Sequence, residues 1–368
     1  MDFKGRRFWW LIPGGLPLTF VLLLGIWWQS LHPAWAQSSN LNTTPPSTPV
    51  RLVFIHHSVG EGWLADYSGN LIGWLNAHNY FVSDTYYGWG PPYNPDDPAD
   101  TSTIGDHTDI GYWYDWFLGG RRDIFLAELY STNHLTTGEG SNSIPQPAGD
   151  NTMVLFKSCF ISGYLITGNP GDPPRQSSSE NPNPIWSVSS GNPEYTVSNI
   201  KGMYRDLLAY FAAHQDKLFI LITTPPSSYD DPELTRSSAE RLRAINTWLV
   251  HHWLDSYPYN NVAVFDYYNV LTSNGGNFAI NDLGADSGNH HRLRNVMVQH
   301  VVGLNNNYSA YCEASDSHPD GAGHQKAAAE FVPLLNVVYN AWKGAGARPF
   351  FMGRSPETEP ARQLLLLD

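Results

Sequence analysis

The stretch VFIHHSVGEGWL, Val53–Leu64, begins as an apolar run and ends in histidine, serine and glycine. Together with the residues before it, it forms the run VRLVFIHH at 50–57, which is short, rich in β-branched residues and almost continuously apolar. Strands that are buried on both faces of a parallel sheet have this composition. We therefore predict a buried strand that ends just before Ser58, with glycines behind it that ease the turn.

Four more apolar runs follow, and stretches of helical spacing separate them. The predicted strands lie at 50–57, 80–87, 151–160, 217–226 and 261–271. The predicted helices lie at 70–79, 110–120, 123–130, 198–214, 238–254, 291–304 and 322–342, the last with a kink or break at Pro333. This alternation indicates a three-layer α/β/α sandwich around a mostly parallel five-stranded sheet, with long loop insertions.

The composition is that of a globular protein with few charges. Of the 368 residues, 42% are hydrophobic and 15% are charged. The formal net charge is −13 and no basic stripe is visible, which argues against nucleic acid as a partner.

The N-terminus resembles a secretory signal, with basic residues, then an apolar stretch, then small residues at a cleavage point. We predict a signal peptide at 1–36 that is cleaved after Ala36, and hence a secreted protein without stable membrane insertion. A retained N-terminal anchor is the alternative. Residues 37–49 are predicted as a Pro/Ser-rich linker, 50–343 as the folded domain, and 344–368 as a loose tail.

The chain has two cysteines, Cys159 and Cys312. In a secreted chain an even pair indicates one disulfide. Cys159 ends the third predicted strand and Cys312 precedes His318, so we expect a bond that pins the His318 loop. The alternative is two separate thiols.

Polar residues follow the predicted strands at the edge where parallel sheets form their sites. Ser58 follows the first strand, and the segment EASDSHPDGAGHQKAA before the last helix carries Asp316 and His318. A serine hydroxyl is a weak nucleophile, so it needs a base, and the base needs a third group to orient it. The sequence therefore predicts Ser58 as nucleophile, His318 as base and Asp316 as orienting acid.

This layout resembles the SGNH hydrolases, also called the GDSL esterase/lipase superfamily, over roughly residues 50–342. That family has its serine after the first strand, and its Asp and His together before the last helix. Here residues 316–321 read DSHPDG. The resemblance implies a flavodoxin-like sandwich and ester hydrolysis through an acyl-enzyme, without a cofactor, in a secreted bacterial subgroup of poorly defined activity.

Two departures from the family pattern concern the catalytic residues. His56 and His57 stand where the family has Gly-Asp before the serine. The Asp–His spacing is one residue short, with Ser315 at the usual Asp position. Glu313 is therefore the alternative to Asp316 as orienting acid.

A third departure concerns the oxyanion hole that the resemblance implies. Gly88 or Gly90, after the second strand, supplies the first donor. The family Asn after the third strand is missing, and Lys157 or Ser158 is the candidate in its place. The missing Asn favours a second class of function, a non-catalytic carbohydrate- or surface-binding protein on a degenerate SGNH scaffold.

Two further patterns leave alternatives open. A zinc cluster of His56, His107 and His318 is conceivable, but no ligand spacing supports it, so no metal is predicted. Aromatic rings either line a sugar-binding cleft or pack the long loops; they are Trp89, Tyr93, Trp113 and Trp116. The expected substrate is a small-molecule or glycan ester.

Overall fold

The computed structural model describes residues 41–272, 290–294, 297–301, 307–312, 316–344 and 350–353. They belong to a compact unit that begins at Asn40. The predicted signal peptide at 1–36 and the first residues of the predicted linker lie outside the described residues. Cleavage and secretion therefore stay predictions.

The centre of this unit is a sheet of five parallel strands in the order β2-β1-β3-β4-β5. The strands are β1 Val50–Ile55, β2 Tyr80–Thr85, β3 Met153–Phe156, β4 Leu218–Ile222 and β5 Val262–Phe265. Each lies inside one of the predicted runs, because such apolar segments are stable where both faces are covered. The predicted mostly parallel, five-stranded α/β fold is confirmed, whereas its flavodoxin-like SGNH type stays a prediction.

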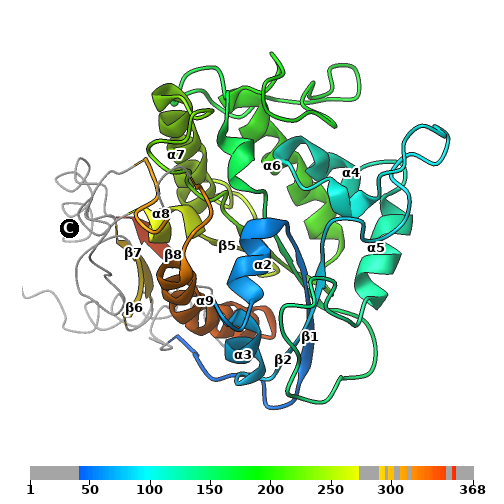
Figure 1. The fold of residues 1–368 in the computed structure, drawn as a ribbon, viewed down its shortest axis with the longest axis vertical. Coiled ribbons are helices and arrows are strands. Elements are labelled where there is room, and N and C mark those ends of the chain that lie inside the picture. The colour runs from blue at the N-terminus through cyan, green and yellow to red at the C-terminus, as the bar shows by residue number, and fades with distance from the viewer. Residues whose placement is uncertain are drawn as a thin grey trace, which may run out of the picture. The chain divides into compact units, whose positions relative to one another are not determined.

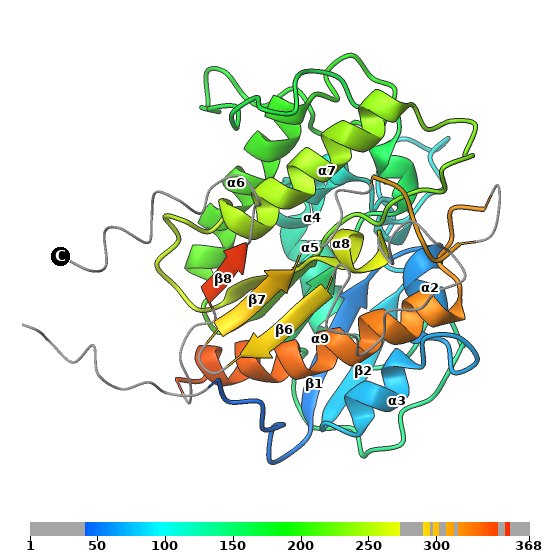
Figure 2. The same cartoon turned by 90° about the vertical axis from the view of Figure 1, so that its left-hand side faces the viewer.

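Helices cover both faces of the sheet, as Figures 1 and 2 show. Side chains alternate along β1, so Val53 and Ile55 enter one core while Leu52 and Phe54 enter another. The first core includes α4 Trp113–Phe117, α5 Arg122–Ser131, α6 Val197–Ala213 and α7 Arg236–His251. The second includes α2 Ser58–Leu64, α3 Leu71–Asn76, α8 Tyr267–Leu271 and α9 Gly321–Trp342.

Helix α9 begins at a side-chain cap. The Asp320 carboxylate accepts a hydrogen bond from the Gly323 backbone N–H at 2.8 Å, as is typical of a helix N-terminus. The helix then runs through Pro333 without the predicted break. The loop that carries His318 therefore ends at a fixed point.

The predicted helix at 291–304 is wrong. The residues from 290 onward instead form β6 His290–Arg294 and β7 Met297–Val301, which pair in antiparallel fashion. Valines and alternating polar residues in the segment suit strands better than a helix. Strand β8 Phe350–Gly353, which falls in the predicted loose tail, pairs with β7 in parallel.

The strand order reverses at β1, because the chain adds β2 on one side of it and β3 on the other. Ile55 is in register with Phe156, so the carboxyl ends of β1 and β3 lie beside each other. In open parallel sheets, ligands bind in the crevice at such a reversal. The residues that follow β1 and β3 therefore meet at one edge of the sheet.

The long loop at 166–194 packs its backbone directly onto the short helix η2 Ile110–Tyr112. A Cβ atom on Gly111 would lie 2.1 Å from the Val188 carbonyl oxygen and 2.5 Å from that of Ile185. Ser187 also donates its N–H to the Gly111 carbonyl at 3.2 Å. Only glycine, which has no Cβ atom, lets the two backbones approach this closely.

We expect Gly111→Ala to lower the free energy of unfolding by about 1 to 3 kcal/mol, because the loop must move away. The matched control is Gly120→Ala, whose Cβ would meet nothing within 4 Å. That variant should stay within about 0.5 kcal/mol of wild type. Urea unfolding of the three proteins measures both values, and equal stabilities would contradict this packing.

Candidate active site

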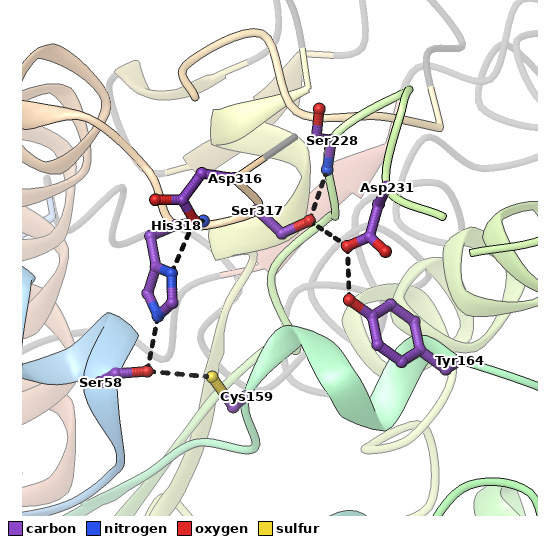
Figure 3. Close-up of polar contacts among 8 residues, drawn as sticks. All are labelled: Ser58, Cys159, Tyr164, Ser228, Asp231, Asp316, Ser317 and His318. Atoms are coloured by element: carbon purple, nitrogen blue, oxygen red, sulfur yellow. Dashed lines mark hydrogen bonds and ion pairs between the residues drawn. The ribbon is translucent and has the colours of Figure 1, made fainter. Parts of the chain in front are cut away.

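Ser58, His318 and Asp316 are joined by a chain of hydrogen bonds (Figure 3). The Ser58 Oγ lies 2.7 Å from His318 Nε2. On the other side of the ring, His318 Nδ1 lies 2.8 Å from Asp316 Oδ1. The same carboxylate oxygen accepts the His318 backbone N–H at 2.9 Å. The structure thus brings together the three residues that the sequence predicted.

Ser58 owes its position to the turn between β1 and α2. It is the first residue of α2, and His57 before it is extended, with φ −124°. The N–H groups of Gly60 and Glu61 donate to the His57 carbonyl at 2.8 and 3.2 Å. A Cβ on Gly60 would lie 2.4 Å from the Cβ of His56, so glycine lets the helix start this close to the strand.

The charge of Asp316 determines which ring nitrogen of His318 carries the proton. Hydrogen bonds from the backbone and the imidazole of His318 lower the pKa of the Asp316 carboxyl. An ionised carboxylate can only accept, so Nδ1 donates to Asp316 and Nε2 is left to accept the Ser58 hydroxyl. The pair lies at the surface, with 42% of the His318 side chain and 59% of the Asp316 side chain exposed.

The two histidines before Ser58 anchor the end of β1. His56 is fully buried, and its Nε2 lies 3.0 Å from Asp84 Oδ2 while its Nδ1 lies 2.8 Å from the His57 carbonyl. His57 Nε2 lies 2.8 Å from the Gly105 carbonyl, and its ring stacks on Tyr87. These contacts explain why polar rings fit at the end of a buried strand.

The three histidines of the zinc alternative have separate partners. His56 is bound to Asp84, His318 to Ser58 and Asp316, and His107 Nε2 lies 2.9 Å from Ser102 Oγ. Within the part of the chain that the structure describes, no group of three or more His, Cys, Asp or Glu side chains is arranged to hold a metal ion.

Most of the predicted oxyanion donors have other partners. The Gly88 N–H donates to Asp106 Oδ1 at 2.9 Å. The Ser158 hydroxyl is buried and accepts the Trp113 indole N–H at 2.9 Å. Lys157 is fully buried, its ammonium donates to the Ser158 carbonyl at 3.2 Å, and burial lowers its pKa. Gly90 lies in a turn against Ile104.

Cys159, rather than Lys157 or Ser158, faces the proposed nucleophile. Its Sγ lies 3.8 Å from Ser58 Oγ, and its side chain is only 3% exposed. The next residue, Phe160, packs edge-on against the His318 ring, with centroids 4.9 Å apart. The place of both residues just after β3 could have revealed them in the sequence.

The structure does not form the predicted disulfide, since Cys159 and Cys312 are both free in it, and the bond stays a prediction for the labelling experiment below. Cys159 Sγ points at Ser58. Cys312 forms a backbone bridge with Pro319, and its thiol lies among the side chains of Ser309 and Ser228. Compartment and cysteine number indicated a bond, but the two thiols face different neighbours.

Of the four rings considered for a sugar-binding cleft, three tryptophans pack inside the core. Trp113 and Trp116 are fully buried and Trp89 is 5% exposed. The indoles of Trp113 and Trp116 donate to Ser158 Oγ and to the His107 carbonyl. These tryptophans pack the long loops and do not line an open cleft.

Comparison with known proteins adds no relative: no protein-family model, no curated protein and no solved structure matches the chain. In the described part of the chain, no helix has both the length and the apolar character needed to cross a membrane.

We expect both thiols to be free in solution. Unfolded, unreduced protein treated with a maleimide should gain two labels per chain, because no disulfide protects either cysteine. The folded protein should gain one label, on partly exposed Cys312, and Cys312→Ser should gain none while folded. Mass spectrometry counts the labels, and an unlabelled unfolded chain would restore the disulfide.

Two buried histidines make stability depend on pH. Burial lowers the pKa of His57 from 6.5 to about 4 and that of His324 from 6.5 to about 3. Between pH 6.5 and these lowered pKa values, the two histidines bind protons in the unfolded chain but stay neutral in the folded chain. The neutral rings therefore contribute their full share to the stability of the fold above pH 6.5, and this contribution is lost as pH falls towards 4.

As pH falls through this window, we expect each of the two rings to lower the free energy of unfolding by about 1.4 kcal/mol per pH unit. His57→Asn, which keeps a residue suited to a helix N-cap, should flatten the slope by about 1.4 kcal/mol per pH unit. His252→Asn is the control, because that ring is 63% exposed. Equal slopes for wild type and His57→Asn in urea unfolding would contradict burial of a neutral His57.

Proposed function

We propose that this chain is a secreted serine esterase or acyl hydrolase of the SGNH type. The observation that carries the proposal is the continuous hydrogen-bond chain Ser58–His318–Asp316, with links of 2.7 and 2.8 Å. A hydroxyl, an imidazole and a carboxylate in this order are the groups that acyl transfer requires. Secretion rests on the sequence of residues 1–36.

In the proposed reaction, Ser58 Oγ attacks the acyl carbon as His318 Nε2 removes the hydroxyl proton. Asp316 holds Nδ1–H and stabilises the imidazolium. The imidazolium then protonates the leaving alcohol, which departs and leaves an acyl group on Ser58. Water, deprotonated by the same ring, releases the acid and restores Ser58.

Negative charge develops on the acyl oxygen during attack, and backbone N–H groups are its proposed donors. The Ser58 N–H is the first of α2, where a helix N–H has no acceptor within the helix. The Gly90 N–H is the second candidate, because the Gly88 N–H is bonded to Asp106. A single such donor contributes about 10²- to 10³-fold to turnover.

The substrate side of the site is open and partly apolar. His318 and Asp316 are solvent-exposed, and Phe160 lies against the imidazole. An ester group that is exposed on its own molecule can therefore reach this surface. An O-acylated glycan remains within the proposal, but it has no support from the tryptophans, since Trp89, Trp113 and Trp116 are buried.

A fluorophosphonate probe and a short-chain aryl ester test this function. We expect the probe to label Ser58, and Ser58→Ala and His318→Ala to abolish both labelling and turnover. Asp316→Asn should lower turnover by about 10⁴-fold, because the ring loses its tautomer. Glu313, the alternative acid, lies outside the described residues, and Glu313→Gln should change little.

The surface pair His252 and Asp255, with Nδ1 and Oδ2 3.2 Å apart, supplies the matched control. His252→Ala and Asp255→Asn should label and turn over as wild type. Labelling that survives in Ser58→Ala would place the nucleophile elsewhere. A wild type without labelling or turnover would overturn the proposal in favour of the non-catalytic binding protein.

A further inference from the structure

The residue between the proposed acid and base points away from Ser58. Ser317 is buried, and its Oγ accepts the Ser228 backbone N–H at 2.9 Å and donates to Asp231 Oδ2. The chain turns here, because the Asp316 carboxylate accepts the backbone N–H of His318 two residues on. Figure 3 shows the result: His318 is directed towards Ser58, Asp316 towards the His318 ring, and Ser317 towards Asp231.

Asp231 connects this loop to a second part of the site. Its Oδ2 also accepts the Tyr164 hydroxyl, and its Oδ1 accepts the Glu233 N–H at 3.0 Å. Tyr164 directly follows the short helix η3 Phe160–Gly163, whose first residue packs on the His318 ring. One carboxylate therefore holds both the segment that carries His318 and the segment that packs against it.

The hydrogen bonds between Asp316 and His318 do not determine how far these side chains lie from Ser58. Among the residues that the structure describes, Asp316 bonds only to His318, two residues away, so these two side chains form a unit that can move together. The distance from this unit to Ser58, 260 residues away, needs contacts to the rest of the molecule. The Pro319–Cys312 bridge lies after His318, and the Ser317–Asp231 bond lies before it.

With the proposed function as premise, we infer that Asp231 is a positioning residue, which through Ser317 places the His318 imidazole on Ser58. It touches neither Ser58 nor the imidazole. Its loss should displace the base while leaving the Asp316–His318 bonds in place. A displacement of about 1 Å in an active site lowers turnover by about 10²-fold.

The test is a double-mutant cycle of Asp231→Asn and Ser317→Ala, read by the rate of fluorophosphonate labelling, kcat, KM and the unfolding midpoint. Each single variant should label and turn over about 10- to 100-fold more slowly with KM unchanged. The double variant should lose clearly less than the product of the two single losses, because both variants remove the Ser317–Asp231 bond. Asp255→Asn, which changes an exposed carboxylate of the surface pair with His252, should behave as wild type.

Wild-type rates in folded Asp231→Asn would overturn the inference and leave the hydrolase proposal intact. Rate losses that multiply in the double variant would also overturn the inference. So would rate losses that follow the unfolding midpoint and vanish on cooling, because they would show a merely structural role. If Asp231→Asn does not fold, folded Ser317→Ala decides alone. A wild type without labelling would instead overturn the proposed function, which is a separate result.

Discussion

Strand β1 has no free edge and no solvent-facing side. It pairs with β2 on one side and with β3 on the other, so its backbone groups are satisfied inside the sheet. Its side chains enter two cores, Val53 and Ile55 in one and Leu52 and Phe54 in the other. A slip of one residue would exchange these two sets, so the register is strongly determined. The position of Ser58 at the end of β1 is therefore determined by the core.

The other members of the site reach Ser58 from loops. His318 lies between a buried anchor at Ser317 and a backbone bridge at Pro319, and the Asp320 cap starts α9 immediately afterwards. Such a loop tolerates changes of sequence more readily than a buried strand does. The molecule thus combines a rigidly held hydroxyl with an imidazole whose position depends on a few polar contacts.

The sequence predicted the scaffold and the meeting of Ser58, His318 and Asp316 better than it predicted their surroundings. The five strands and the place of Ser58 follow from apolar runs and from where they end, which are local properties of the chain. The direction of a side chain is not local. For that reason cysteine number indicated a bond between Cys159 and Cys312, whereas the two thiols face different neighbours in the structure. The partner of Asp231 likewise could not be predicted, because it depends on the direction in which the Ser317 side chain points.

The separation of 260 residues between Ser58 and His318 has a consequence for biosynthesis. Strands β1 and β2 are adjacent in sequence and can pair early, whereas β3 must be added to the other edge of β1 later. Contacts between such distant segments form slowly, because a long loop must close first. When the nascent chain has been synthesised only as far as β5, it contains Ser58 but not yet His318. The assembled site therefore comes into existence only when the final segment of the domain has been synthesised and docked.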